Sequence, residues 1–154
     1  MKAQFKALTM ACIMAAGTIA AAPAFAAHAT PVSTTFSATG PTSLSVLGVP
    51  VPCTSNFVLV TDASGNVTVT QATFSGSATC TSVHATGLPW SASFSSTTAA
   101  TISGVSVSTP FGSCSGSVGV AINNAASQIS LSGTLGICSV SGTLTVAPTF
   151  TVVN

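Results

Sequence analysis

The segment from Ser117 to Ile137, SVGVAINNAASQISLSGTLGI, decides the fold class. Apolar residues stand at alternate positions from Val118 to Ile122 and again from Ile129 to Ile137. A period of two places apolar side chains on one face of a strand and small polar ones on the other. The pattern predicts two half-buried strands joined by a turn at the polar cluster 123–127.

The same alternation extends over most of the chain, as in Val67–Thr70, Trp90–Ser95 and Thr143–Val146. The continuous apolar run Phe57–Val60 predicts a central strand buried on both faces. Further strands are expected at Val32–Ala38, Leu44–Leu47, Ile102–Val107 and Phe150–Val153. About ten short strands with frequent turns predict an all-β fold, a single-domain antiparallel β-sandwich or jelly roll.

Residues 1–26 have the composition of a secretory signal peptide. Lys2 and Lys6 precede an apolar stretch from Ala7 to Ala22, and Ala24-Phe25-Ala26 supplies the small residues of a cleavage site. A retained membrane anchor is the weaker interpretation, because the apolar stretch is shorter than the roughly 20 residues that span a bilayer. We therefore expect an exported domain, residues 27–154, with no transmembrane segment.

Four cysteines remain after that cleavage: Cys53, Cys80, Cys114 and Cys138. An even number in an exported protein predicts disulfides, and no pair has the close spacing of a zinc site. Turn-rich clusters stand midway between the first two, at 62–66, and midway between the last two, at 123–127. If each segment folds back on itself, the pairs are Cys53–Cys80 and Cys114–Cys138.

Charge excludes several classes of function. Charged residues make up 2% of the chain, and Lys2 and Lys6 are its whole complement of Lys and Arg. The expected mature chain cannot neutralise phosphates, so nucleic-acid binding is excluded. With Asp62 as the one acid, the paired carboxylates of glycoside hydrolysis are impossible.

The sharpest catalytic pattern is Gly112-Ser113-Cys114-Ser115-Gly116, which has the spacing of a nucleophile elbow. The elbow requires a following helix, whereas residues 117–122 have strand periodicity, and Cys114 is expected in a disulfide. A triad would have to use His84 with Asp62, and Asp62 stands in a predicted turn where it bonds its own backbone. We predict no catalytic residues, metal or cofactor.

Ser and Thr supply 46 of the 128 residues after Ala26. Alternation places many of them on the solvent side, where hydroxyl groups hydrate the surface without charge. Little electrostatic repulsion then opposes contact between copies, so the surface favours apolar interfaces and self-association. An uncharged secreted scaffold explains the same composition.

Gly87-Leu88-Pro89-Trp90 is the most distinctive local feature and holds the one Trp of the chain. Leu88 and Trp90 are candidates for an apolar contact at a binding surface. The alternative is a Trp that packs in the core at the start of a strand, where its large area contributes most by burial.

The segment Ala72 to Cys80, with ATFSGSATC, and Gly87 to Trp90 together resemble the protein activators of alkane oxidation (Pra-type) of Gram-negative bacteria. The resemblance extends from about Thr34 to Thr151, with the other cysteines in support. It implies a small extracellular protein without catalytic residues that promotes growth on n-alkanes by emulsifying or delivering the hydrocarbon.

Two hypotheses of function follow. The first is a secreted, non-enzymatic accessory protein that acts by surface activity, emulsification or apolar ligand binding, with hydrocarbon or another apolar surface as its partner. The second is a structural subunit of an extracellular fibre or biofilm matrix, joined by strand addition at the segments Val32–Ala38 and Thr143–Val153. The expected location is extracellular, with the periplasm as the alternative.

Overall fold

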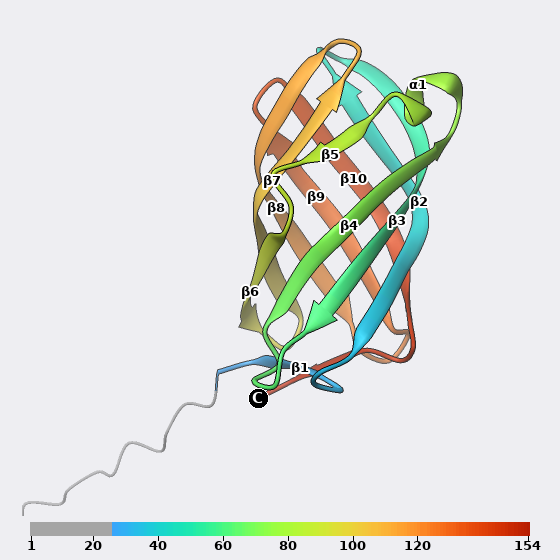
Figure 1. Cartoon of the computed structure of the whole chain (residues 1–154). Coiled ribbons are helices and arrows are strands. Elements are labelled where there is room, and N and C mark those ends of the chain that lie inside the picture. The colour runs from blue at the N-terminus through green and yellow to red at the C-terminus, as the bar shows by residue number, and fades with distance from the viewer. Residues whose placement is uncertain (1–25) are drawn as a thin grey trace, which may run out of the picture.

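The structure, a computed structural model, describes residues 26–154. The predicted leader lies outside these residues except for Ala26. The described chain forms eleven strands and one short helix (Figure 1): β1 (His28–Thr30), β2 (Thr35–Val46), β3 (Val49–Thr61), β4 (Val67–Gly76), α1 (Ala78–Thr81), β5 (His84–Thr86), β6 (Trp90–Ser96), β7 (Ala99–Thr109), β8 (Gly112–Asn123), β9 (Gln128–Leu135), β10 (Cys138–Ala147) and β11 (Thr151–Val153).

The all-β prediction is confirmed, but the predicted sandwich or jelly roll is wrong: the main sheet closes into an eight-stranded barrel. The antiparallel order β7-β6-β4-β3-β2-β10-β9-β8 is completed by pairing of β8 with β7, from Thr109 opposite Gly112 to Ala99 opposite Ala121. Alternation in sequence is the same for one face of a sandwich and for a barrel wall. The pattern therefore gives no sign of which strands pair to close the sheet.

Long strands replace several of the short ones expected. The segments predicted at Val32–Ala38 and Leu44–Leu47 contribute to one strand, β2, which runs through Gly40 and Pro41. The run Phe57–Val60 is not buried on both faces: Phe57 and Leu59 point into the barrel, whereas Val58 and Val60 are only half-buried. A barrel wall has a single inner face, so every strand keeps an outer side.

The barrel interior is the hydrophobic core. It is filled by inward side chains from all eight strands, and Phe36 and Phe150 pack edge to face at 5.4 Å. The cavities between these side chains are small: two of about 30 and 50 Å³ are lined by apolar residues, and another of about 30 Å³ also borders Thr42 and Ser55. Such volumes are close to the size of a single water, so the interior is packed and offers no ready space for a ligand.

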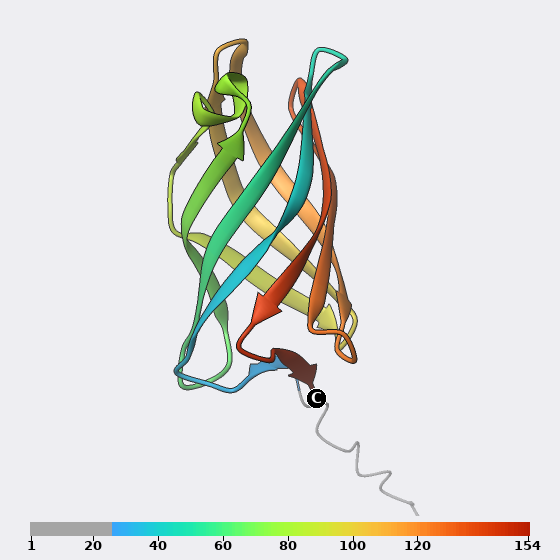
Figure 2. The same ribbon diagram turned by 90° about the vertical axis from the view of Figure 1, so that its right-hand side faces the viewer.

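A two-stranded sheet of β1 and β11 crosses one end of the barrel (Figures 1 and 2), with His28 opposite Val153. Most of the strand residues in the segments proposed for strand addition pair within the barrel, and β11 pairs on one side with β1. Ser37 and Ala38 pair with both β3 and β10, and Thr35 and Phe36 pair with β3. Residues 143–145 pair with β9, and 145–147 with β2. Closure uses the backbone groups that an added strand would need.

Candidate functional site

The end of the barrel opposite β1 and β11 carries three two-residue turns with large apolar side chains. Leu47, Phe111 and Ile137 occupy the turns β2–β3, β7–β8 and β9–β10, all at the upper end in Figures 1 and 2. Their side chains are exposed by 71%, 52% and 50%, and that of Val49, directly after the first turn, by 55%. Two-residue hairpin turns ordinarily hold Asn, Asp or Gly. Leu47, Val49, Phe111 and Ile137 are called the apolar tip below.

The turns of the apolar tip are neighbours in space because their hairpins follow one another around the barrel. The backbone N–H of Leu47 donates to the carbonyl oxygen of Ile137 at 3.3 Å. A Cβ placed on Gly112, the residue after Phe111, would lie 3.5 Å from Cδ1 of Ile137. Ile137 thus lies next to the other two turns, and the apolar side chains stand on adjoining turns at one end of the barrel.

The backbone of Leu47 is strained. Its φ is +50°, and that of Gly48 is +83°, the sign that a type I′ turn needs at both central positions. For an L-residue the left-handed region costs roughly 1–2 kcal/mol, and Asn or Gly normally avoids that cost. A leucine that is both strained and exposed is explained by neither folding nor burial, so it points to a function.

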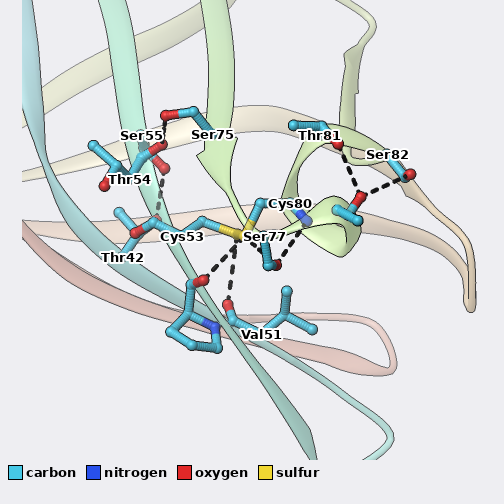
Figure 3. The surroundings of a disulfide bond; sticks show 12 residues. Thr42, Val51, Cys53, Thr54, Ser55, Ser75, Ser77, Cys80, Thr81 and Ser82 are labelled. Atoms are coloured by element: carbon cyan, nitrogen blue, oxygen red, sulfur yellow. Dashed lines mark hydrogen bonds between the residues drawn. A yellow bond between two sulfur atoms is a disulfide. The ribbon is translucent and has the colours of Figure 1, made fainter.

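Both disulfides lie at the tip end and have the pairing expected from the sequence, Cys53–Cys80 and Cys114–Cys138. Cys138 directly follows Ile137, and Cys114 stands three residues after Phe111. Figure 3 shows the first disulfide, which ties β3 to α1, where the Ser77 hydroxyl accepts a hydrogen bond from the Cys80 N–H at 3.3 Å. The disulfides restrain the chain on both sides of the tip.

The opposite end of the barrel, called the polar end below, holds Asp62 and also the partly exposed Val32 and Val153. There the Asp62 carboxylate accepts hydrogen bonds from the Ser64 N–H at 2.8 Å, the Asn66 N–H at 2.9 Å and the Asn66 side chain at 2.7 Å. The Asn66 side chain is the largest of the influences that lower the pKa of Asp62 below its ordinary value. As predicted, Asp62 forms a turn and is the one carboxylate side chain of the sequence. This turn joins β3 to β4 at the end of the barrel opposite the β2–β3 turn (Figure 1).

Trp90 and Leu88, the apolar contacts considered from the sequence, lie elsewhere. Trp90 is buried beside Phe57, with ring centroids 6.4 Å apart, and its indole N–H donates to the Thr86 carbonyl at 2.9 Å. Trp90 therefore packs in the core, which was the alternative to an apolar contact at a binding surface. Leu88 is half-buried on a groove beside β5.

Sequence reasoning missed the apolar tip, although a signal was present. Leu47 and Phe111 each precede a glycine, and Ile137 follows one, so each belongs to a turn in which glycine has a positive φ. An apolar residue beside such a glycine, between two alternating strands, is the pattern to look for.

Within residues 26–154 no group of His, Cys, Asp and Glu is placed to hold a metal ion. No helix in this part of the chain has the length and apolar character needed to cross a membrane.

Comparison with known proteins places the chain in a family. A family model described as "Alkane oxidation protein activator PraA/PraB-like" matches residues 1–154, the whole chain. The chain belongs to this family. Membership of the PraA/PraB-like activators confirms the resemblance carried by Ala72–Cys80 and Gly87–Trp90, and two disulfides fit a non-cytoplasmic location for such a protein. Searches of curated proteins and of solved structures gave no match.

Proposed function

We propose that this PraA/PraB-like protein is an exported, non-enzymatic accessory protein that adsorbs to liquid hydrocarbon through its apolar tip and so helps to emulsify it. The observation that carries the proposal is the gathering of the exposed Leu47, Val49, Phe111 and Ile137 at one end of a rigid barrel.

The energy available at the tip is sufficient for reversible adsorption. Full burial of one such side chain contributes about 1.5–3 kcal/mol, and the exposed fractions leave half or more of that to be gained at an interface. The four side chains together therefore supply roughly 3–7 kcal/mol. An oil surface collects many copies, so this modest energy per molecule supports coating of droplets.

The rest of the surface costs little to bring near oil. Residues 26–154 contain no Lys, Arg or Glu, and Asp62 lies at the far end, so adsorption at the tip desolvates no ion. Hydroxyl groups on the barrel wall remain in water and keep the coated droplet hydrated.

Adsorption to hexadecane droplets tests the proposal. The mature protein is mixed with the emulsion, and the protein left in the aqueous phase gives the partition constant. Leu47→Ser with Phe111→Ser should weaken partition by about 30-fold or more, because together they remove roughly 2–4 kcal/mol of apolar burial.

The matched control is Val32→Ser with Val153→Ser at the polar end, where the two valines are 42% and 39% exposed. This control should adsorb like the unaltered protein. Equal losses in the two double variants would show that adsorption is not localised at the tip and would overturn the proposal.

A further inference from the structure

A groove opens beside the barrel where β4 loses its neighbour. β4 pairs with β6 only over Val67–Val69, and further along β4 the chain on that side is β5, which pairs with β7. The groove between them has a volume of about 380 Å³, within the range of small-molecule sites. Its lining includes Gln71, Ala72, Phe74, His84, Ala85 and Leu88.

The lining is divided between apolar and polar groups. Phe74, Ala85 and Leu88 are half-buried and pack against the core, whereas the side chains of Gln71 and His84 are exposed at the rim. An apolar floor with a few hydrogen-bonding groups at its edge suits an amphiphile, whose tail covers the floor while its head bonds the rim.

Part of the groove is too narrow for an inserted strand. Cα atoms of β4 and β5 approach within 8 Å of each other, whereas two strands that flank a third are roughly 9.5 Å apart. A single alkyl chain is slender enough for this space. This narrow part favours a small molecule over an extended peptide from a second copy as the occupant.

The lack of Lys and Arg around the groove favours an uncharged head group on the bound amphiphile. With no Lys or Arg in residues 26–154, the groove has no cationic side chain to compensate a carboxylate, sulfate or phosphate. The side chains of Gln71 and His84 offer hydrogen-bonding groups that match a hydroxyl. We propose that the groove binds a neutral amphiphile with one hydroxyl head and an alkyl tail, as in a medium-chain primary alcohol.

Phe74 connects the groove to the surroundings of Trp90, so that binding of the alkyl tail can be followed by Trp90 fluorescence. Phe74 lines the groove and also the interior cavity that Trp90 borders. A tail that lies against Phe74 and Leu88 changes the surroundings of Trp90, the one Trp of the chain. Binding is then followed by the fluorescence of Trp90 without any label.

The experiment titrates the mature protein with 1-octanol below its solubility limit, by Trp90 fluorescence and by calorimetry. Ala85→Phe fills the groove, and Ala72→Leu fills it with less risk to folding. Each should weaken binding at least about tenfold, since it excludes two or more methylene groups of the tail. Gln71→Leu with His84→Leu should weaken octanol and leave octane unaffected or tighter.

Octanoate at pH 8 provides the test of the head group and should bind at least about tenfold more weakly than 1-octanol. Saturable binding at one site, lost in the filled variants, supports the inference. No saturable binding, equal binding by the filled variants, or octanoate as tight as octanol would overturn it. Leu47→Ser with Phe111→Ser should keep octanol binding, so this result is separate from that for hexadecane adsorption.

Discussion

Replacement of Leu47 by Asn separates stability from adsorption. Leu47 has a φ of +50°, and Asn accepts that conformation far more readily than Leu. The exposed Leu side chain makes little contact with the core, so its loss costs little in folding. We expect Leu47→Asn to raise the free energy of unfolding by about 1 kcal/mol, or the Tm by about 3–5 °C.

The same substitution should weaken adsorption. Leu47 is 71% exposed, so its transfer to oil contributes about 1–2 kcal/mol of the 1.5–3 kcal/mol for full burial. Its removal should reduce the partition constant for hexadecane droplets by about 5- to 30-fold. Urea unfolding and depletion of protein from the aqueous phase measure the two effects on one preparation.

Ser33→Asn is the matched control, because Ser33 has a φ of +51° at the polar end and an exposed side chain. It should raise stability by a similar amount and leave adsorption unchanged. The reasoning fails if Leu47→Asn lowers stability or adsorbs like the unaltered protein. It also fails if Ser33→Asn weakens adsorption as much, because stability itself would then control adsorption.

Three further predictions concern stability. Hydrogen bonds, first that of the Asn66 side chain, lower the pKa of Asp62 in the folded protein. Its contribution to folding stability is therefore present above the unfolded-state pKa of about 3.9 and is lost as the pH falls through the folded-state pKa. In Asp62→Asn the urea midpoint should no longer fall with acid in this way. Cys114→Ser with Cys138→Ser should cost about 3.5 kcal/mol in urea unfolding, since the bond spans 24 residues; a loss below about 1 kcal/mol would contradict the chain-entropy estimate. Gly142→Ala should destabilise by about 2 kcal/mol or more, because its Cβ would lie 2.7 Å from the Pro41 carbonyl oxygen; an unchanged Tm would show that the strands can separate there.

The sequence predicted the strands better than their arrangement. Alternation located the β8–β9 hairpin, and the turn clusters at 62–66 and 123–127 predicted both disulfide pairs. Closure was not predictable, because it depends on pairing between β7 and β8 and on close backbone approach at glycines such as Gly142. These contacts leave no periodic trace in the chain.

The apolar character of the candidate site could be predicted from the sequence, but its location could not. The shortage of charge indicated an apolar contact, but Trp90, the largest apolar side chain, lies in the core. Size favours burial in the folded protein, so the most conspicuous apolar residue is a poor guide to a binding surface. Leu47, Phe111 and Ile137 are informative because turns normally exclude them.

The arrangement of the two ends accounts for how a protein with so little charge can present apolar groups in a fixed direction. An apolar side chain on a mobile loop would fold back on the barrel wall and be lost to an interface. Here two-residue turns leave no slack, each turn joins two strands that pair directly with each other, and a disulfide follows Ile137 at the next residue. The tip therefore keeps its area exposed, and the strain at Leu47 is tolerated because the barrel is stable enough to bear it.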